Sequence, residues 1–334
     1  MTEFLDICYD SMKRQEQAIP KTIDAVDETA ASIVEGKKQI ILTGSGDSYA
    51  AAHYGKWAFL RVGLNALAIS PDEIHNLCID KDTVVIGISA SGRSLVTIEA
   101  LQKAKSEGAT GVVLTDNKDG TASREADHVW VTKSGVTTYD TSPQATTTTA
   151  MVYLLAVSAG INKESKGGLE QDIEQLKSVV KELMIWAERE GIAISQLTSP
   201  NVPIYLMAEG PNHVATQIGM MKFNEFSVLP GIAVVKEEFR HHYVLSINNN
   251  DTAVLVTKSP VDSSNDSYLR ALTESLKMRA YHLHTGESIG LQLPLVQTIP
   301  NAIALQMAAY HSVLKHDPDK DAFKQPNIDA FKIY

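Results

Sequence analysis

Three serines and a glycine within six residues form the most chemically suggestive segment of the chain. Ser89-Ala-Ser-Gly-Arg-Ser94 follows an apolar run and precedes a stretch with helical spacing. Backbone N–H groups and the positive end of a helix at such a turn bind anions, and hydroxyl groups add donors. A serine-rich helix cap has the same composition. The segment is therefore either a phosphate-binding loop, with Ser89, Ser91, Gly92 and Ser94 as its donors, or an ordinary cap.

A second turn rich in glycine and hydroxyl groups favours the phosphate-binding alternative. Gly44-Ser-Gly-Asp-Ser48 also separates an apolar run from a helical stretch. Parallel strands end at the same edge of a sheet, so we expect Ser48 beside Ser89 and Ser91, with Gly46 in the turn. Neither segment has the glycine spacing of a dinucleotide-binding turn or the lysine of a P-loop. We expect an anion site without a cofactor.

The elements that would position these turns alternate between strand and helix. Apolar runs predict strands, and a 3.6-residue period predicts helices. The predicted strands lie at 39–43, 82–88, 111–114 and 128–131, and the predicted helices at 2–35, 49–62 and 95–108. This alternation predicts an α/β fold with a doubly wound, mainly parallel sheet, whose ligands bind at the carboxyl ends of the strands.

A second α/β series begins near residue 201 and resembles the first. Leu42–Ala51 is similar to Met207–Ala215, and Asp82–Ser89 is similar to Asp251–Lys258, at nearly the same offset along the chain. Two matches at one spacing suggest an internal duplication. The serine loop occurs in the first copy alone, which predicts one phosphate loop for the pair.

The chain length also predicts two domains, because a single hydrophobic core rarely serves 334 residues. We expect a first domain at 1–165, a helical linker at 166–200 and a second domain at 201–334. Each domain is expected to be a doubly wound sheet between layers of helices.

Composition excludes several classes of function. Thirty basic and 40 acidic residues give a formal charge of −10, whereas nucleic-acid binding requires clustered Lys and Arg, so no nucleic-acid partner is expected. No segment suits a signal peptide or a membrane span. Cys8 and Cys78 lack CxxC spacing, so we expect neither a disulfide nor a metal site. These features are typical of a cytoplasmic protein.

Thr43-Gly-Ser-Gly-Asp-Ser-Tyr-Ala-Ala-Ala52 and Ser89–Ser94 resemble the sugar-binding loops of the SIS (sugar isomerase) family. The resemblance is strongest to the isomerase half of glucosamine-6-phosphate synthase and to related single-chain deaminases, and it extends over nearly all of the chain. It implies two tandem SIS domains and a sugar phosphate as the ligand. Thr141–Ala145 aligns roughly with a segment that carries a cation in relatives. Ser142 and Gln144 are therefore weaker candidates for substrate binding.

The same resemblance implies catalytic residues. Lys222-Phe-Asn-Glu225 matches the family's Lys-x-x-Glu, so Glu225 would move a proton between C1 and C2 of the sugar through an enediol. His241, with His242 as its rival, falls where the family has a histidine that opens the sugar ring. Lys332 lies near the place of a lysine that forms a Schiff base. The family's site is shared across a homodimer, with the histidine contributed by the neighbouring subunit.

Without the resemblance, each of these residues has an ordinary structural interpretation. A glutamate on an amphipathic helix is usually solvated, adjacent histidines can be incidental, and a lysine near a terminus is usually exposed. His282 and His284 alternate on an expected strand, and we interpret them as structural.

The chain also departs from the synthase pattern. It begins Met1-Thr2 instead of with a nucleophilic cysteine, so we expect no glutamine-dependent transfer. Arg93 stands where the synthase loop has a glutamate, which places a positive charge beside the phosphate position and is closer to the deaminase and deglycase branches. The run before Lys332 also lacks the synthase's usual Arg-Asn-Leu-Ala.

The function that these features favour is an aldose–ketose isomerase and deaminase that converts glucosamine-6-phosphate to fructose-6-phosphate and ammonia. Glucose-6-phosphate isomerisation and deglycation of a fructosamine phosphate are alternatives that use the same base and phosphate loop. A sugar-phosphate sensor without catalysis is the alternative from another class.

Overall fold

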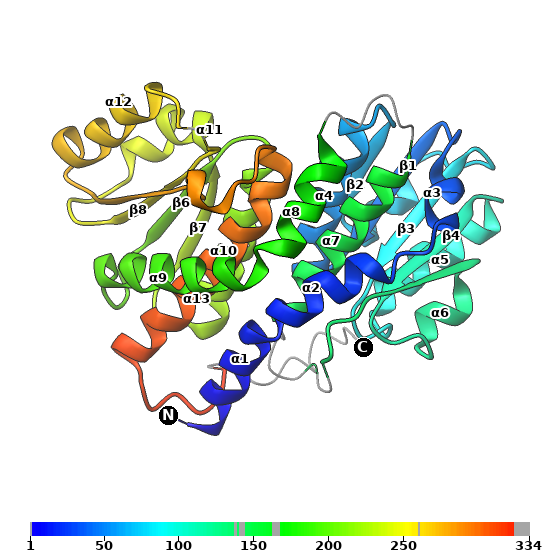
Figure 1. Cartoon of the computed structure of the whole chain (residues 1–334), viewed down its shortest axis with the longest axis horizontal. Helices are drawn as coiled ribbons and strands as arrows, with labels where there is room; N and C mark the ends of the chain where they lie inside the picture. Colours follow the sequence, from blue (N-terminus) through cyan, green and yellow to red (C-terminus); the bar gives the residue numbers. More distant parts are fainter. Residues whose placement is uncertain (1, 137–138, 140–143, 162–167, 260, 324–334) are drawn as a thin grey trace. The chain divides into compact units, whose positions relative to one another are not determined.

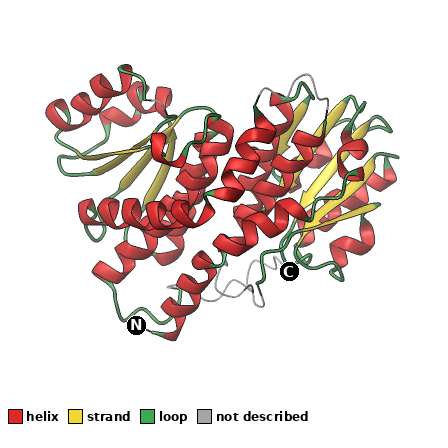
Figure 2. Cartoon of the chain, in the orientation of Figure 1, coloured by secondary structure: helices red, strands yellow, loops and turns green. Residues whose placement is uncertain are grey.

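The computed structural model describes the chain except residues 1, 137–138, 140–143, 162–167, 260 and 324–334 (Figure 1). Contacts between Cα atoms divide it into two compact units. We call Lys13–Glu170 the first-sheet unit, and Met1–Met12 together with Gln171–Pro326 the second-sheet unit. Figure 2 shows a strand layer flanked by helices in each.

The sheet of the first-sheet unit is entirely parallel and has the strand order β2-β1-β3-β4-β5. Its strands are β1 (Gln39–Gly44), β2 (Ala66–Ile69), β3 (Thr83–Ile88), β4 (Thr110–Thr115) and β5 (His128–Val131). The order reverses between β1 and β3, which are paired in register from Gln39 with Thr83 to Gly44 with Ile88. A ligand site is expected outside this point of reversal.

Helices cover both faces of this sheet. Successive residues of each central strand are apolar and point to opposite faces, so both faces must be buried. Ile41 and Val85 join the cluster under α5 (Leu95–Ser106) and the 3-10 helix η1 (Pro71–Asn76). Leu42 faces Gly55 of α4 (Asp47–Arg61), where any Cβ would lie 2.4 Å from the leucine. The buried helix α7 (Gln144–Gly160) lies against α4.

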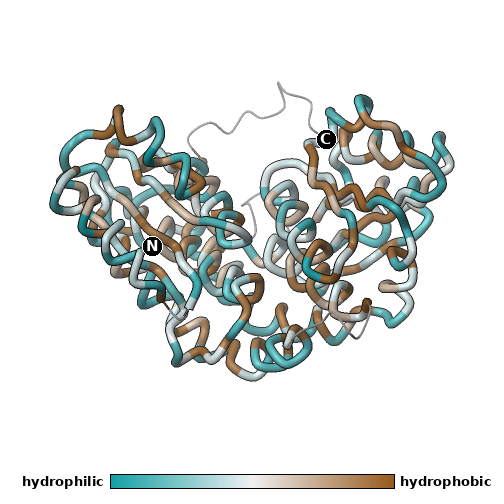
Figure 3. Tube along the Cα trace, turned by 90° about the horizontal axis from the view of Figure 1, so that it is seen from above, coloured by the Kyte–Doolittle hydropathy of each residue, from teal (hydrophilic) through white to brown (hydrophobic). Residues whose placement is uncertain are grey.

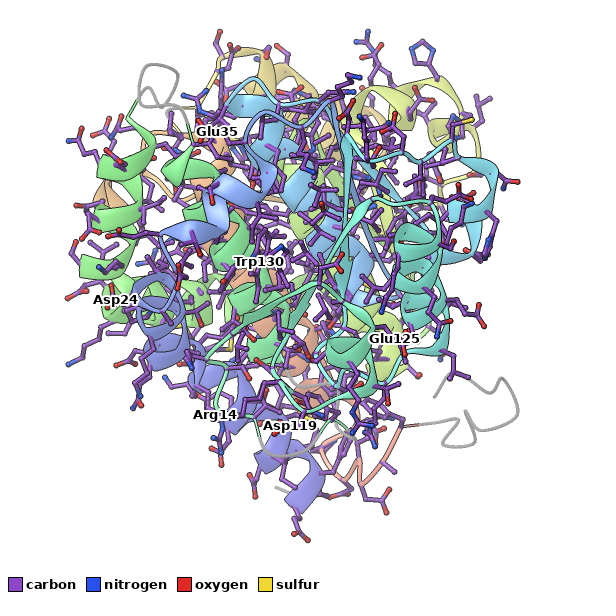
Figure 4. The ribbon with its side chains drawn as sticks, turned by 90° about the vertical axis from the view of Figure 1, so that its right-hand side faces the viewer. Arg14, Asp24, Glu35, Asp119, Glu125 and Trp130 are labelled. Carbon is purple, nitrogen blue, oxygen red and sulfur yellow. The ribbon has the colours of Figure 1, made fainter. Side chains whose placement is uncertain are left out.

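Three shorter helices and one aromatic pair complete the unit. They are α2 (Gln15–Asp24), α3 (Thr29–Val34) and α6 (Thr121–Glu125). Trp130 of β5, labelled in Figure 4, stacks on Tyr153 of α7 with ring centroids 5.5 Å apart. The outermost strand is thereby packed against α7.

The second-sheet unit repeats this strand order with one strand fewer. Its parallel sheet has the order β7-β6-β8-β9. The strands are β6 (Ile204–Ala208), β7 (Gly231–Val235), β8 (Thr252–Val256) and β9 (Arg279–Leu283). In both units, the first strand of the series pairs with the second on one side and with the third on the other.

The helices of the second-sheet unit also cover both faces of its sheet. One face packs against α11 (Lys236–His241), η2 (Tyr243–Leu245) and α12 (Ser264–Arg270), which continues as a π-helical turn at Ala271–Ser275. On the other face lie α10 (Asn212–Phe226) and α13 (Pro294–His316). Gly219 of α10 has no side chain, so Leu206 of β6 and Leu305 of α13 can pack against the backbone of α10. The remaining helices are α1 (Glu3–Lys13), α8 (Leu169–Ser178), α9 (Val180–Leu197) and η4 (Glu287–Ile289). Figure 3 shows hydrophobic residues concentrated along the strands of each unit.

The predicted strands and helices are confirmed, but two features of the organisation differ from the expectation. The helical segment at 2–35 is three helices, of which α1 groups with the second-sheet unit because its apolar face is buried there. Of the predicted linker, residues 171–200 group with the second-sheet unit in this division. Its helix α9 packs on α13, and the Asp172 carboxylate of α8 accepts hydrogen bonds from the backbone N–H groups of Gln292 and Leu293.

Candidate functional site

An open pocket lies in the first-sheet unit at the carboxyl ends of its strands. Its walls come from the ends of β3, β4 and β5, from the first turn of α4 and from α7. They comprise Asp47, Ser48, Ile88, Ala90, Leu114, Thr115, Asp116, Thr132, Thr146, Thr147 and Ala150. The pocket lies where the strand order reverses, as expected for a ligand site in a doubly wound sheet.

Hydrogen bonds from the loop after β4 hold the serine loop at the pocket. Ser89 and Ser91 are buried, with 4% and 6% of their surface exposed. Thr115 donates from Oγ1 to the Ala90 carbonyl at 3.1 Å, and Asn117 donates from Nδ2 to the Ser91 carbonyl at 3.0 Å. Gly92 has a φ of +66°, and a Cβ there would lie 3.2 Å from the Cα of Gly120. Glycine is therefore required at this position.

The side chain of Ser94 does not cap the helix that it precedes. Ser94 is the N-cap residue of α5 but makes no side-chain cap hydrogen bond. Its Oγ instead accepts a hydrogen bond from Thr97 Oγ1 at 3.1 Å, which leaves the hydroxyl proton of Ser94 able to donate. Ser91 does act locally, since its Oγ accepts from the Arg93 N–H at 3.3 Å. The helix-cap alternative therefore does not describe Ser94.

The turn after β1 brings Ser48 to the same pocket. Gly46 is the N-cap residue of α4 and has a φ of +56°, which favours glycine. At Gly44, a Cβ would lie 2.8 Å from both the Ile88 carbonyl oxygen and the Ser48 Cβ. The end of β1, the end of β3 and Ser48 therefore meet closely. This agrees with the predicted position of Ser48 at the strand reversal.

Two carboxylates that the sequence analysis did not single out, those of Asp47 and Asp116, line the pocket. Asp47 accepts a hydrogen bond at Oδ2 from Thr147 Oγ1 at 3.0 Å. Asp116 accepts hydrogen bonds from the hydroxyl groups of Thr132 and Ser134, one on each oxygen. Burial raises the pKa of Asp116, and these hydrogen bonds oppose the rise. The signal that could have found Thr115, Asp116 and Thr132 is their position directly after predicted strands.

Four further candidates, the weaker substrate-binding residues Arg93, Ser142 and Gln144 and the catalytic candidate Lys332, fall into three groups. Gln144 is buried at the start of α7, whereas Arg93 is exposed. Ser142 lies outside the described residues, and so does Lys332. Their predicted roles therefore stay predictions.

In the second-sheet unit, Lys222 and Glu225 form an ion pair on α10. Lys222 Nζ lies 2.9 Å from Glu225 Oε2 and 3.1 Å from Oε1. The Lys222 side chain is fully buried, whereas the Glu225 side chain is 32% exposed. A buried ammonium group favours the ionised form of its carboxylate partner. The pair thus presents an oriented carboxylate that retains access to solvent.

Cys8 of α1 lies within electrostatic range of this pair. Burial, and then the negative charge of Glu225, raise the pKa of the Cys8 thiol to about 12, although Lys222 lowers it. A buried thiol with a raised pKa is a weak nucleophile. Cys8 is therefore a packing residue beside the candidate base.

His241 is on the surface of the second-sheet unit. Its side chain is 63% exposed at the end of α11, and its Nε2 lies 3.0 Å from Glu237 Oε1. This hydrogen bond lowers the pKa of Glu237. His242 is also exposed, with its Nδ1 3.9 Å from Glu238 Oε2.

His282 and His284 lie at the end of β9, with ring centroids 4.8 Å apart. The Nε2 of His282 lies 2.8 Å from Thr257 Oγ1 of the neighbouring strand. Burial and the proximity of His284 lower the pKa of His282 to about 4. The candidate residues thus divide between units, with the serine loops in the first-sheet unit and Glu225 and His241 in the second-sheet unit.

The fold and the pocket define a class of protein. A doubly wound parallel sheet with a hydroxyl-lined pocket at its strand reversal is typical of α/β proteins that bind small polar ligands. Residues 33–161 match the SIS domain family, so the chain contains a SIS domain, which coincides with the first sheet and its pocket. The match does not extend to the second sheet. The expectation of a second SIS domain therefore stays a prediction, although the two sheets share their strand order.

Relatives in sequence include the glutamine–fructose-6-phosphate aminotransferase (isomerizing) of Sulfolobus acidocaldarius, which is 23% identical over 324 residues. That match covers 93% of this chain and 53% of the relative. The enzyme of the same name from Methanococcus maripaludis is 26% identical over 320 residues, covering 88% of this chain and 51% of the relative. The chain thus spans about half the length of these relatives.

Solved structures share the fold over nearly the whole chain. The C-terminal domain of glucosamine-fructose-6-phosphate aminotransferase from Francisella tularensis has a TM-score of 0.78 at 19% identity, covering 96% of this chain and 98% of that one. Glucosamine-6-phosphate deaminase from Thermotoga maritima has a TM-score of 0.70 at 14% identity, covering 96% and 97%. Identities this low show similarity of fold alone.

Proposed function

We propose that this protein is a phosphosugar aldose–ketose isomerase and deaminase that converts glucosamine-6-phosphate and water to fructose-6-phosphate and ammonia. The observation that carries the proposal is the hydroxyl-lined pocket at the strand reversal of a SIS domain, bordered by the serine loop. The names of the relatives support this substrate class, since they include an aminotransferase of fructose-6-phosphate and a glucosamine-6-phosphate deaminase.

In this proposal the first-sheet unit binds the phosphate. Ser89, Ser91, Gly92 and Ser94 surround the dianion at the start of α5, and Ser48 contributes a hydroxyl from α4. The available proton of Ser94 and the positive end of the 12-residue helix α5 both suit an anion. Arg93 would supply positive charge from the exposed side of the loop.

Glu225 is the proposed base. It removes the proton from C2 of the open-chain 2-amino aldose and returns it to C1, which leaves the C1 oxygen as a hydroxyl and the nitrogen as an imine at C2. Water then adds at C2, and the nitrogen leaves as ammonia. The ion pair with Lys222 supports this role, because it fixes an ionised carboxylate with access to solvent.

His241 is the proposed ring-opening group, and Lys332 is the proposed imine-forming amine. We propose that His241 serves the site of a neighbouring subunit in a homodimer, as the family resemblance implies. Its 63% exposure supports a role outside its own unit, and Leu245, which follows on the next turn, is 85% exposed. In a homodimer, both exposed side chains would be available for contact with the neighbouring subunit.

The test is to incubate the purified protein with glucosamine-6-phosphate and, separately, with fructose-6-phosphate. Released ammonia and glucose-6-phosphate are measured in both cases. Ammonia release should fall by about 10²- to 10⁴-fold in Glu225→Gln, as for the loss of a general base. Glu274→Gln, which changes an exposed carboxylate of the same unit, should leave the rate unchanged.

The other outcomes identify the alternatives. Glucose-6-phosphate formed without ammonia would make the protein an isomerase. Turnover of a fructosamine phosphate, with neither of the other reactions, would make it a deglycase. Binding of sugar phosphates without any turnover would make it a sensor and would contradict catalysis by Glu225.

A further inference from the structure

The charges of the pocket conflict with a ligand that is only an anion. Among the described residues that line it, the charged side chains are the carboxylates of Asp47 and Asp116. A carboxylate in a partly buried pocket repels a phosphate. A ligand that places its phosphate at the serine loop must therefore present a different group to the rest of the pocket.

The backbone fixes Asp116 relative to the serine loop. The N–H of Asp116 donates to the carbonyl of Ala90 at 3.1 Å, and Ala90 lies between Ser89 and Ser91. Asp116 follows directly after β4, which pairs with β3, and its carboxylate is hydrogen-bonded to Thr132 and Ser134 beyond the end of β5. The carboxylate therefore has a constant offset from the proposed phosphate position, so it can recognise a particular group of a sugar phosphate.

Hydrogen bonds favour the ionised form of this carboxylate, which accepts, and oppose the larger effect of burial, which raises its pKa. Thr132 and Ser134 each donate to one of its oxygens. Its two oxygens offer four acceptor positions, and the backbone N–H of Ser134 takes one besides the two hydroxyl groups, so Asp116 can accept one more hydrogen bond from a ligand. Asp47, which also lines the pocket, accepts a hydrogen bond from Thr147 at one of its oxygens. The hydroxyl groups of Thr132, Ser134 and Thr147 thus donate their protons to the two carboxylates.

An ammonium group matches such a pair of carboxylates. It supplies a positive charge and three N–H donors, and charge-assisted hydrogen bonds are about twice as strong as neutral ones. A sugar hydroxyl at the same position supplies one donor and no charge. Burial also disfavours the ionised form of Asp116, a cost that a bound cation offsets.

We propose that Asp116, assisted by Asp47, recognises a protonated amino group of the substrate, so that the pocket selects cationic amino sugar phosphates over neutral hexose phosphates. This inference rests on the proposed function, because it takes the serine loop as the phosphate site. It makes Asp116 a specificity-determining residue.

The test measures dissociation constants by titration calorimetry in the Glu225→Gln background, in which the ligand is not consumed. The ligands are glucosamine-6-phosphate, glucose-6-phosphate and N-acetylglucosamine-6-phosphate, whose amide is neutral. The starting protein should bind the amine about tenfold or more tightly than either neutral sugar, the gain expected of a charge-assisted hydrogen bond. Asp116→Asn should reduce this ratio to near one, by weakening glucosamine-6-phosphate and not glucose-6-phosphate.

Two further variants make the result specific. Asp119→Asn changes an exposed carboxylate on the same loop, labelled in Figure 4, and should keep the tenfold ratio. Thr132→Val removes one of the two hydroxyl donors to Asp116 and should lose part of the ratio. It also tests the proposal if Asp116→Asn does not fold.

Equal binding of glucosamine-6-phosphate and glucose-6-phosphate by the starting protein would overturn this inference and leave a phosphosugar site in place. An unchanged ratio in both Asp116→Asn and Thr132→Val would also overturn it. Failure of all three sugar phosphates to bind would instead overturn the proposed function, and the inference with it.

Discussion

At the residue scale, the surroundings of His282 in the second-sheet unit lower the pKa of its imidazole. It is partly buried and accepts or donates one hydrogen bond with Thr257, and the positive charge of Lys236 lies close enough to lower its pKa further. Asp266 opposes this effect, but burial and His284 prevail, and the pKa falls to about 4 from the ordinary 6.5. Because the pKa of His282 is lower in the folded protein than in the unfolded chain, protonation of this imidazole destabilises the folded state.

The stability of the protein should therefore fall in acid. The contribution of His282 is fully present above pH 6.5, the unfolded value, and is lost as the pH falls toward 4. The loss should be on the order of 1–2 kcal/mol, because the group is only partly buried. Denaturant unfolding of the protein and of His282→Gln, at several pH values in this range, measures it.

In His282→Gln the acid-induced loss should shrink by that amount. His75→Gln, at an exposed position of the first-sheet unit, is the matched control and should keep the full loss. Parallel pH profiles for the protein and for His282→Gln would contradict the assignment.

Residues of the site could be predicted where the chemistry is local in sequence. The serine loop is one continuous segment, and Ser48 follows a recognisable strand and turn. Asp116, Thr132 and Thr147 come from separate elements and meet only at the edge of the folded sheet. Their types are ordinary for loops and helices, so only the position of Asp116 and Thr132 after predicted strands could have indicated them, and nothing in the sequence indicated Thr147.

At the scale of elements, sequence patterns predicted the long strands better than the short ones. β1, β3 and β4 are continuous apolar runs buried on both faces, which is the pattern of parallel strands. β2 has four residues and β7 begins with a glycine, and neither was singled out. These strands pair beside longer neighbours, so their formation depends on tertiary contacts.

The packing of α9 on α13 depends on one glycine. A Cβ at Gly191 would lie 2.5 Å from the Cβ of Met307 and 2.8 Å from the backbone nitrogen of Ala308. In an isolated helix, alanine in place of glycine stabilises by about 1 kcal/mol. Here backbone atoms of α13 stand in the way, so the helices would have to move apart.

Gly191→Ala should therefore lower the free energy of unfolding by about 2 kcal/mol, despite the better helix propensity of alanine. Denaturant titration measures the change. Gln196→Ala, at an exposed position of the same helix, should change stability by no more than about 0.5 kcal/mol. Stabilisation by Gly191→Ala would show that the two helices are not in close contact.

At the scale of the whole molecule, the chain alternates between its units. Residues 1–12 belong with 171–326, although the first-sheet unit follows them directly in sequence. Leu5 is fully buried, and the ring of Phe4 lies edge-on to Phe226 and Phe323 at centroid distances of 6.5 and 5.1 Å. Within the described residues, no helix has the length and apolar character needed to cross a membrane.

Leu5→Ala should therefore destabilise the second-sheet unit by about 2–4 kcal/mol, the usual cost of truncating a buried leucine. Hydrogen exchange followed by mass spectrometry should show faster exchange in peptides from 204–256, with peptides from 39–131 unchanged. Ile7→Ala, at a position that is 38% exposed on the same helix, should have little effect. Faster exchange confined to 39–131 would assign α1 to the other unit.

The grouping of residues 1–12 with 171–326 also bears on synthesis. The apolar face of α1, with Leu5, Cys8 and Met12, leaves the ribosome before the first-sheet unit, and its partners in the second-sheet unit emerge only after that whole unit. At ordinary translation rates this delay is on the order of tens of seconds. Throughout that time the nascent helix α1 exposes an unburied apolar stripe, which is the kind of segment that molecular chaperones bind.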